Sequence, residues 1–465
     1  MKLHKIKSPN TILILAGVLV VVALLTYIIP AGEYDRQEKD GRELVVPGSY
    51  KTVESNPQFI DEVLTVPIRG FISAAEIIGF ILLVGGAFYV FQRTGAVDAG
   101  IRSIAKAHRK SKLLQKILIP LFMVIFSLAG AVFGMSEEVI PFILIFVPLA
   151  LTLGYDSVTG VAIPFIGAGV GFAGAFINPF TLGIAQGIAG LTPLSGIEYR
   201  IIVWFVLTTV AVAFVSIYAY KVKKNPAKSF MFEQDQEKRA KIDLTEIDNH
   251  EGINLRHKLV LISFSASLVI LVFGVLEYGW YIKEICALFL AAGILTGLAG
   301  GLKLNEIVNA FVDGGKDLIS TGFVVALSKG ILIVASDGRI IDTILYNLTS
   351  ILENFHPIIS SQMMFFVQTF INFFMPSGSG QAALTMPIMA PLSDLIGVSR
   401  QTAVLAFQFG DGFSNMIIPT SAVTMGVLSM AGIPWQKWAK WILLLELILI
   451  FTGCLLLIPP FFIGW

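Results

Sequence analysis

The chain has 465 residues, of which 55% are hydrophobic and only 14% are charged, and its formal net charge is +1. Soluble domains carry about 25% charged residues, so much of this chain must face something other than water. A net charge this small, without a basic stripe, gives no sign of a nucleic-acid partner and leaves the lipid bilayer as the expected surroundings.

A short basic segment opens the chain, in which Lys2, Lys5 and Lys7 precede the apolar run Thr11–Ile29. No small-residue cleavage site follows at the spacing of a signal peptide, so we expect a retained first transmembrane helix. The predicted first region, 1–73, contains this helix and an extracytoplasmic loop.

A series of apolar segments follows, and a helix needs about 20 mostly apolar residues to cross the hydrocarbon core. Two segments, Val139–Leu153 and Ala382–Ile396, are short, and two, Val158–Ile188 and Thr402–Met430, are long and interrupted. The pattern predicts an all-α polytopic membrane protein. The full series is Thr11–Ile29, Ala74–Phe91, Ile117–Phe133, Val139–Leu153, Val158–Ile188, Ile201–Tyr220, Leu259–Leu276, Ile285–Leu302, Leu318–Val334, Ile358–Phe374, Ala382–Ile396, Thr402–Met430 and Trp441–Ile463.

The basic residues set the expected orientation, because Lys and Arg accumulate in cytoplasmic loops. They cluster in 92–116, at the start of the polar linker 221–258, in 303–316 and in 437–440. Counting the crossings places all of these and the N-terminus in the cytoplasm and the C-terminus outside, in a bacterial inner membrane. Four tryptophans resemble an interfacial aromatic belt: Trp435, Trp438, Trp441 and Trp465.

The two halves of the chain resemble each other at a constant offset of 243 residues. We therefore predict a first repeat over 74–220, a cytoplasmic linker over 221–258, two scaffold helices over 259–316 and a second repeat over 317–465. The segments 74–91 and 318–334 run in opposite directions, so the repeats are inverted, as in many secondary transporters. Pairs at this offset include Gly79 with Gly322, Ser136 with Ser379, Glu138 with Gln381, Gly167 with Gly410, and Gly169 with Gly412.

Each repeat carries a polar tip between two short apolar segments, at 134–138 in the first repeat and 375–381 in the second. Polar, irregular backbone at membrane depth survives only where it lines a cavity or is packed in protein. The tips are therefore predicted to end re-entrant hairpins that enter from opposite sides. An ordinary turn outside the membrane is the alternative.

Each repeat also carries a broken helix, 158–188 in the first and 402–430 in the second. The first break is expected at 174–179, and the second at 410–415 and on to 419–421. Proline removes a backbone donor and glycine permits unwinding, so free carbonyls and helix ends become available to an ion or a substrate. A simple proline kink is the alternative reading of Pro179.

Ionisable residues inside the spans are few, and each is a functional hypothesis. Glu137 and Glu138 lie at the first tip, Asp411 lies in the second break, and Lys329 lies inside 318–334. Three acids against one lysine favour a cationic substrate group, or a proton or sodium as coupling ion. The predicted substrate-binding residues are Ser136, Glu137, Glu138, Asn178, Lys329, Ser377, Ser379, Gln381, Asp411, Asn415 and Thr420. The predicted coupling-ion residues among them are Glu138, Asp411, Asn178 and Asn415.

Four strings resemble the YfcC-like family. That family is grouped with basic amino-acid (arginine/ornithine) antiporters and is often labelled C4-dicarboxylate anaerobic carrier. The resemblance covers essentially the whole chain and implies the ion-transporter superfamily fold, in which two hairpins and two broken helices hold the substrate, often in a homodimer. The strings are Gly-Ala-Val-Phe-Gly-Met-Ser-Glu-Glu (130–138), Leu-Gly-Tyr-Asp-Ser (153–157), Ser-Gly-Ser-Gly-Gln-Ala-Ala-Leu-Thr-Met-Pro (377–387) and Phe-Gln-Phe-Gly-Asp-Gly-Phe-Ser (407–414).

The resemblance also carries one departure. By position, the hairpin tips correspond to 136–138 and 377–381, where sodium–dicarboxylate relatives have Ser-Asn-Thr at both tips. This sequence has that triplet at neither tip, which weakens the case for dicarboxylate binding and two-sodium coupling. The acids of the first tip suit an amino acid with a cationic side chain better.

The predicted function is a secondary transporter of a small solute, most simply a basic amino acid moved by exchange or ion-coupled symport. The alternative is a carrier of C4-dicarboxylates or other carboxylates, with Lys329 and the tip serines binding the anion. A remote alternative is an intramembrane hydrolase, whose tip serine would need a base within reach. Only Lys329 could act as this base, because the histidines lie in loops or at segment ends. The chain also has no His-Glu-x-x-His metal motif within the membrane. The sequence thus predicts no enzyme, no metal and no cofactor.

Overall fold

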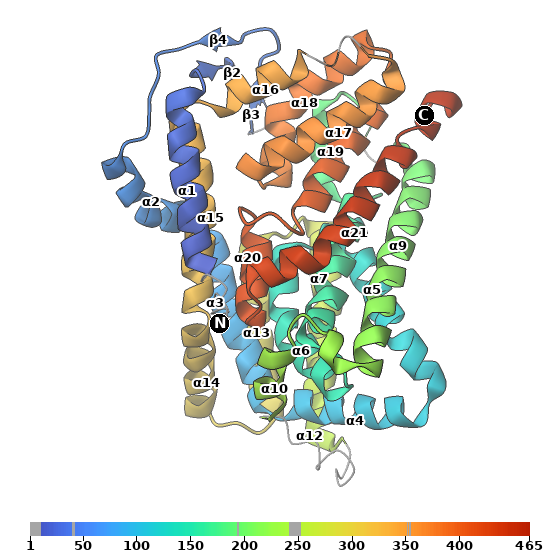
Figure 1. Ribbon diagram of the computed structural model, residues 1–465. Coiled ribbons are helices and arrows are strands. Elements are labelled where there is room, and N and C mark those ends of the chain that lie inside the picture. The colour runs from blue at the N-terminus through green and yellow to red at the C-terminus, as the bar shows by residue number, and fades with distance from the viewer. Residues whose placement is uncertain (1–10, 40–41, 193–194, 241–252, 351, 353–354) are drawn as a thin grey trace, which may run out of the picture.

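The computed structural model describes residues 11–39, 42–192, 195–240, 253–350, 352 and 355–465 (Figure 1). The first half of the chain forms α1 (Thr11–Ile28), α2 (Ile60–Ser73), α3 (Ala75–Arg93), α4 (Ala96–Lys110), α5 (Lys112–Phe133), η1 (Glu137–Phe142), α6 (Ile143–Thr152), α7 (Ser157–Ala173), η2 (Pro179–Gly183), α8 (Ile184–Ile188) and α9 (Ile197–Lys224). The linker forms η3 (Pro226–Lys228) and α10 (Phe232–Ala240). The second half forms α12 (Leu255–Tyr278), α13 (Ile282–Ala299), α14 (Leu304–Asp317), α15 (Ile319–Asp337), α16 (Ile341–Thr349), α17 (Pro357–Phe374), α18 (Gly378–Leu395), α19 (Arg400–Ser414), α20 (Ala422–Ala431), α21 (Trp435–Leu456) and α22 (Pro459–Ile463).

The loop between α1 and α2 adds a small amount of β structure to this helical fold. Strand β1 (Gly32–Glu33) pairs antiparallel with β4 (Lys51–Thr52), and β2 (Arg36–Lys39) pairs antiparallel with β3 (Arg42–Val45). Arg36 forms an ion pair with the buried Asp342 of α16 at 2.9 Å, and the backbone N–H of Tyr34 donates to the same carboxylate. The loop is thereby fixed to the second repeat.

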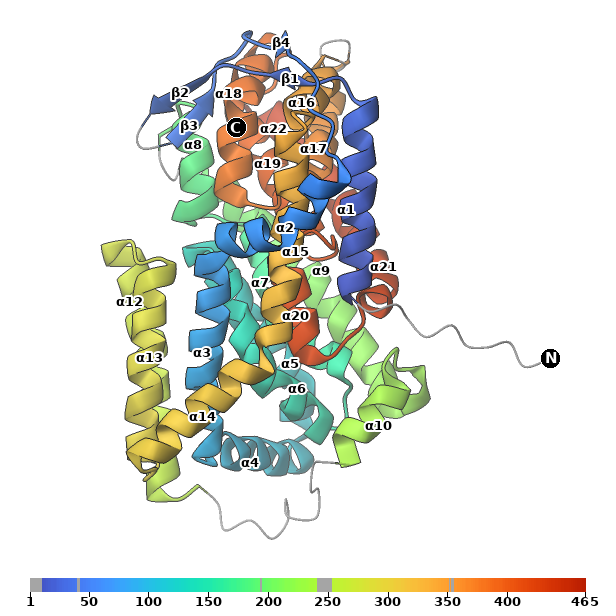
Figure 2. The ribbon, with the colours of Figure 1, turned by 90° about the vertical axis from the view of Figure 1, so that its left-hand side faces the viewer.

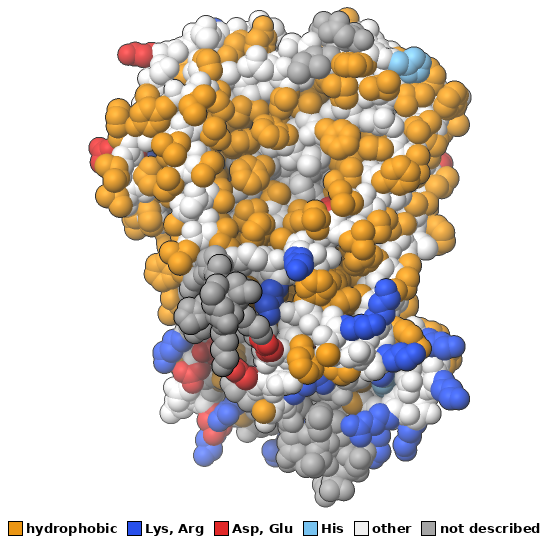
Figure 3. Space-filling view, in the orientation of Figure 1, with side chains coloured by type: hydrophobic (Ala, Val, Ile, Leu, Met, Phe, Trp, Pro, Cys, Tyr) orange, Lys and Arg blue, Asp and Glu red, His pale blue; other side chains and the backbone are white. Residues whose placement is uncertain are grey.

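The surface is that of a multi-span membrane protein. Among the described residues, seven helices are long and apolar enough to cross a membrane, and many of their large side chains face outward. Hydrophobic side chains cover most of the upper part of the face in Figure 3, whereas Lys and Arg gather toward the lower end. The seven are Ala75–Arg93, Lys112–Phe133, Ile197–Lys224, Leu255–Tyr278, Ile282–Ala299, Ile319–Asp337 and Trp435–Ile463.

The helix boundaries repeat with the same offset as the sequence. Shifting α2, α3, α5 and α7 by 243 residues gives α14, α15, α17 and α19 to within two residues at either end. α8 and α20 correspond in the same way at their C-terminal ends. Three helices that sequence hydropathy did not predict, α2, α4 and α14, belong to this pattern or lie next to it.

Each repeat contains a helical hairpin followed by a broken helix. The hairpin of α5 and α6 lies in the lower half of the molecule, and the hairpin of α17 and α18 lies in the upper half (Figures 1 and 2). α5 packs along α7, and α17 packs along α19. Helices α12 and α13 lie side by side at one edge, where α13 packs on α3. The predicted all-α fold with two inverted repeats is confirmed.

The second break begins later than the sequence predicted. Residues 410–414 are helical, and the irregular segment runs from Asn415 to Ser421. The two glycines serve close packing instead: a Cβ on Gly410 would collide with Gln368, and one on Gly412 with Ala173. The prediction that these glycines break the helix was wrong, because a packed helix also retains glycine where a neighbouring segment approaches closely.

Small residues let the first hairpin approach its broken helix. A Cβ on Gly130 would collide with the carbonyl oxygen of Ala168, one on Gly167 would lie 2.9 Å from the carbonyl oxygen of Met123, and one on Gly171 would collide with the carbonyl oxygen of Ser127. Close backbone approach through small residues is the usual way helices associate in lipid, where no hydrophobic force drives them together.

We expect Gly171→Ala to destabilise the protein, because the new methyl group would push α7 away from α5. Overpacking of this kind costs roughly 1–3 kcal/mol. Gly79→Ala is the matched control, because a Cβ there meets nothing within 4 Å. Thermal unfolding in detergent measures both variants; equal melting temperatures would contradict this account of the α5–α7 contact.

The linker helix α10 binds the ends of helices from both repeats at the lower end of Figure 1. Asp235 is buried; its carboxylate accepts hydrogen bonds from the backbone N–H, at 2.8 Å, and the hydroxyl of Ser157, at the N-terminus of α7. Lys238 donates to Ser157 Oγ at 3.0 Å and to the carbonyl oxygen of Ala431, the last residue of α20, at 2.7 Å. Arg239 donates to the carbonyl oxygens of Leu151 and Tyr155, where α6 ends.

The charges of α10 match the helix ends they contact. A carboxylate at a helix N-terminus and cations at helix C-termini are both stabilised by the helix dipole. Burial lowers the pKa of Lys238, while the neighbouring Asp235 opposes that change. α10 therefore connects the first hairpin, the first broken helix and the second broken helix.

Candidate functional site

The first hairpin tip begins where α5 ends. Gly134 has φ +73°, a left-handed conformation that favours glycine, and a Cβ there would lie 2.6 Å from Oδ1 of Asn178. The chain then turns through Ser136, whose backbone N–H donates to Oε2 of Glu138 at 3.0 Å. Glu138 is buried and Glu137 is half-buried, at the start of η1. The first tip thus touches the first break directly.

The first break centres on Asn178. The backbone N–H groups of Phe176, Ile177 and Asn178 all donate to the carbonyl oxygen of Ala131, at 3.2–3.4 Å. The side-chain Oδ1 of Asn178 caps the following turn by accepting from the backbone N–H groups of Phe180 and Thr181 at 2.8 and 3.3 Å. Asn178 is fully buried, and its Nδ2 has no partner among the described residues.

The second break is organised by Asp411, in the last turn of α19. Asp411 is fully buried, and its Oδ1 accepts from Nδ2 of Asn415 at 2.8 Å. Its Oδ2 has no hydrogen-bond partner among the described residues. Asn372, near the end of α17, donates to the carbonyl oxygen of Asp411, to Ser414 Oγ and to Asn415 Oδ1, at 3.2, 2.8 and 3.0 Å.

Two of the predicted belt tryptophans contact this break. Nε1 of Trp438 donates to the carbonyl oxygen of Met416, and Nε1 of Trp435 donates to that of Ile417, both at 2.8 Å. Trp438 and Trp441 are buried. The expectation of a belt was wrong for Trp438, which is fully buried and whose indole N–H donates to a carbonyl group that the broken helix leaves free.

The second tip meets both breaks. Ser377 caps α18 with its side chain, and the next residue, Gly378, lies where a Cβ would collide with the methyl group of Thr181 and lie 2.9 Å from Oδ2 of Asp411. Ser379 is exposed. Gln381 points into its own hairpin, where its Nε2 donates to the carbonyl oxygen and to Oε1 of Gln368, at 2.9 and 2.7 Å.

Lys329 of α15 completes the set of charges. It is half-buried and interacts electrostatically with Glu137, which also interacts with Asp411. Within the described part of the chain, Lys329 makes no ion pair within 4 Å. The adjacent Ser328 donates to the carbonyl oxygen of Pro419 in the second break at 3.4 Å.

The structure therefore brings most of the predicted residues to the tips and breaks. Asn178 lies against the first tip, and Asp411 and Asn415 contact each other beside the second tip. Ser379 is exposed and Gln381 braces the hairpin, so neither is aimed at Asp411. Three contributing residues were not predicted: Thr181, Gln368 and Asn372. For Asn372 the signal was a single amide inside the apolar run 370–374.

Unpaired polar atoms concentrate at this junction. A buried polar atom without a partner costs about 1–3 kcal/mol, so such atoms are normally few. Five of those here are oxygens and only one is a nitrogen, which suits a bound cation. Within the described residues the atoms are Thr181 Oγ1, Asn372 Oδ1, Gln381 Oε1, Asp411 Oδ2, Thr420 Oγ1 and Asn178 Nδ2.

Comparison with known proteins gives consistent matches over the whole chain. The family model of the C4-dicarboxylate anaerobic carriers (DcuC) matches residues 8–461. A candidate basic amino acid antiporter of Escherichia coli (strain K12), YfcC, is 37% identical, with 93% of this chain and 92% of that protein covered. A protein of Haemophilus influenzae, described as uncharacterized, is 29% identical, with 97% and 95% covered.

Two solved structures match the chain at low similarity. The YdaH transporter of Alcanivorax borkumensis has a TM-score of 0.45 and 13% identity, covering 98% of this chain and 99% of that one. MtrF of Neisseria gonorrhoeae has a TM-score of 0.43 and 16% identity, covering 97% and 95%.

Proposed function

We propose that the chain, which belongs to the C4-dicarboxylate anaerobic carrier family, is a secondary active transporter. We propose further that it moves an amino acid with a cationic side chain across the inner membrane. The observation that carries the substrate assignment is the unpaired Oδ2 of Asp411, buried where the second tip meets the first break. An ammonium or guanidinium group supplies the donors that this oxygen and its unpaired neighbours lack.

The balance of charge supports the same substrate. The tips and breaks hold three acids, Glu137, Glu138 and Asp411, whereas one half-buried lysine, Lys329, interacts with Glu137. A buried carboxylate is costly unless it is paired, so a cationic ligand would be stabilised here. The relative named as a basic amino acid antiporter agrees with this assignment. Transport by exchange and symport with a proton or sodium ion both fit a site rich in unpaired oxygens.

The inverted hairpins and broken helices support alternating access around the junction of tips and breaks. The gathering of Lys and Arg at the lower end of Figure 3 supports a cytoplasmic location for that end. In this orientation the first hairpin enters from the cytoplasm and the second from outside.

A second candidate substrate is a C4-dicarboxylate. Two observations favour it: the description of the family, and the half-buried ammonium of Lys329, which has no ion-pair partner within 4 Å among the described residues. In this reading Lys329 and the serines of the tips would bind the two carboxylates.

Thermal unfolding of the purified protein with added solutes separates the two substrates. A ligand that binds the folded state stabilises it by about 2.7 kcal/mol at 100 times its Kd. We expect arginine, lysine or ornithine to raise the melting temperature. Citrulline, which has the shape of arginine without its charge, is the matched control and should not. A shift with succinate or fumarate alone would overturn the proposed substrate.

A further inference from the structure

A second charged group lies apart from the tips and has no counter-charge. Arg200, in the first turn of α9, is fully buried. Its Nη1 donates to Oε1 of Gln408, and its Nη2 donates to Oε1 of Gln401 at 3.1 Å and to the carbonyl oxygen of Gln401 at 3.5 Å. The guanidinium lies 5.1 Å from the centre of the Trp465 ring. Among the described residues no carboxylate pairs with it, although a buried ion is stable only when it is paired.

Two donors of this cluster remain unpaired. Within the described residues, Nε of Arg200 and Nε2 of Gln408 are buried and have no hydrogen-bond partner. These donors belong to groups that already contact each other through Nη1 and Oε1. Acceptors are in excess at the tips, whereas donors and positive charge are in excess here. An anion would supply the acceptors and the negative charge that this cluster lacks.

Helix α19 carries residues of both the Arg200 cluster and the site at the tips. Gln401, Gln408 and Asp411 are buried on one face of it, and Gln408 precedes Asp411 by three residues, or about 4.5 Å along the axis. Arg200 lies beyond Gln408, on the side away from the tips. An amino acid with a cationic side chain likewise has its carboxylate several ångströms from its cation, so one solute could contact residues of both sites.

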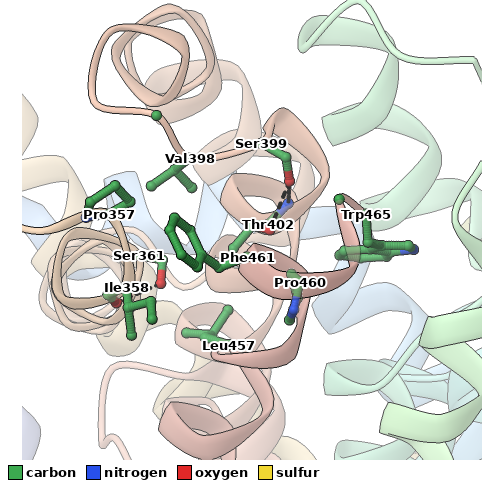
Figure 4. Close-up of a pocket in the computed structure, with 12 residues that line it drawn as sticks. Pro357, Ile358, Ser361, Val398, Ser399, Thr402, Leu457, Pro460, Phe461 and Trp465 are labelled. Atoms are coloured by element: carbon green, nitrogen blue, oxygen red, sulfur yellow. Dashed lines mark hydrogen bonds between the residues drawn. The ribbon is translucent and has the colours of Figure 1, made fainter.

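The cluster also lies next to a surface cavity. A cavity of about 220 Å³ at the upper end of the molecule is lined by Thr402, Phe461 and Trp465, among others (Figure 4). Thr402 follows Gln401 on α19, and Trp465 stacks on Arg200. A solute entering this cavity therefore meets the indole that covers the guanidinium.

We propose that Arg200 and Gln408 form an anion subsite that binds the carboxylate of the transported solute, while Asp411 binds its cationic end. Only the second half of this assignment rests on the proposed function. A guanidinium binds carboxylates through paired hydrogen bonds, and hydrogen bonds to ions are about twice as strong as neutral ones. The unpaired Nε of Arg200 and Nε2 of Gln408 are the donors assigned to the carboxylate.

The test is calorimetric binding of arginine, agmatine (arginine without its carboxylate) and succinate to the purified full-length protein. Arg200→Gln should weaken arginine binding about 10- to 100-fold and leave agmatine binding within about threefold. Gln408→Glu should do the same without loss of stability, because it places a carboxylate beside Arg200 that competes with the ligand. This second variant keeps the test valid if Arg200→Gln does not fold. Arg400→Gln is the matched control, because Arg400 is more exposed and pairs with Asp394 at 2.7 Å.

The outcomes separate the subsite from the proposed function. Unchanged arginine binding in folded Arg200→Gln and Gln408→Glu would overturn the subsite and leave the substrate assignment standing. A second outcome is that the wild-type protein binds succinate but neither arginine nor agmatine, and that both variants lose succinate binding. This would overturn the proposed substrate and support the subsite. Wild-type protein that binds none of the three, or succinate binding that both variants retain, would overturn both.

Discussion

Replacing Asp411 by asparagine should abolish counterflow of a cationic amino acid in proteoliposomes while leaving the protein folded. Removing one partner of a buried charge pair costs about 2–5 kcal/mol, which corresponds to a loss of affinity of roughly 30-fold or more. The asparagine keeps the oxygen that accepts from Nδ2 of Asn415 at 2.8 Å. The substitution therefore removes the charge facing the second tip and preserves the bond that shapes the break.

The matched control for this experiment is Asp394→Asn. Asp394 is exposed at the end of α18 and pairs with Arg400 outside the site, so its loss should leave counterflow near the wild-type rate. Melting temperatures of both variants should stay close to that of the wild-type protein. Wild-type counterflow in Asp411→Asn would remove this carboxylate from the substrate site.

Gly378→Ala should also eliminate substrate binding, through shape alone. The added methyl group would collide with the methyl group of Thr181 and lie 2.9 Å from Oδ2 of Asp411, in the place where a ligand would approach that oxygen. We expect affinity for the transported solute to fall about 100-fold or more, because either the tip must move or the methyl group occupies the space next to Oδ2 of Asp411. Binding of the solute that raises the melting temperature of the wild-type protein measures this.

Two further variants show whether the effect is local. Gly380→Ala, in the same tip, meets nothing closer than Ser377 Oγ at 3.1 Å and should retain binding within a few-fold. Thr181→Ser removes the methyl group that the new Cβ would strike, so the double variant Gly378→Ala/Thr181→Ser should recover part of the lost affinity. Equal losses in Gly378→Ala and Gly380→Ala would mean that the tip tolerates no side chain anywhere, and that contact with Thr181 is not the reason.

The sequence predicted the hairpins and breaks because their signals are chemical and local. Glycine, proline and polar residues inside apolar runs have few stable arrangements in a membrane, and the 243-residue offset related one repeat to the other. Hydropathy did not predict helices α2, α4 and α14, because they mix charged and apolar residues. Their burial depends on neighbours that hydropathy does not include, as when Gly70 of α2 packs on the backbone of Ala326 in α15.

Site residues were harder to predict than the elements that carry them. Thr181, Gln368 and Asn372 matter through contacts with other segments, which lie between 13 and about 200 positions away. A single amide in an apolar run does not show its partners. The sequence did not indicate that Arg200 is buried, because it lies at a helix end, where an arginine side chain usually reaches water. In the structure it is fully buried against Gln401 and Gln408, more than 200 residues further along the chain.

The linker helix α10 changes what a cycle of this protein must include. Asp235, Lys238 and Arg239 bind the termini of α6, α7 and α20, so they join elements that belong to different repeats. The two repeats cannot separate at that end unless these contacts of α10 break first. Any cycle that separates the two repeats at this end must therefore include the opening of these contacts, and the rate of that opening would limit how often the carrier turns over.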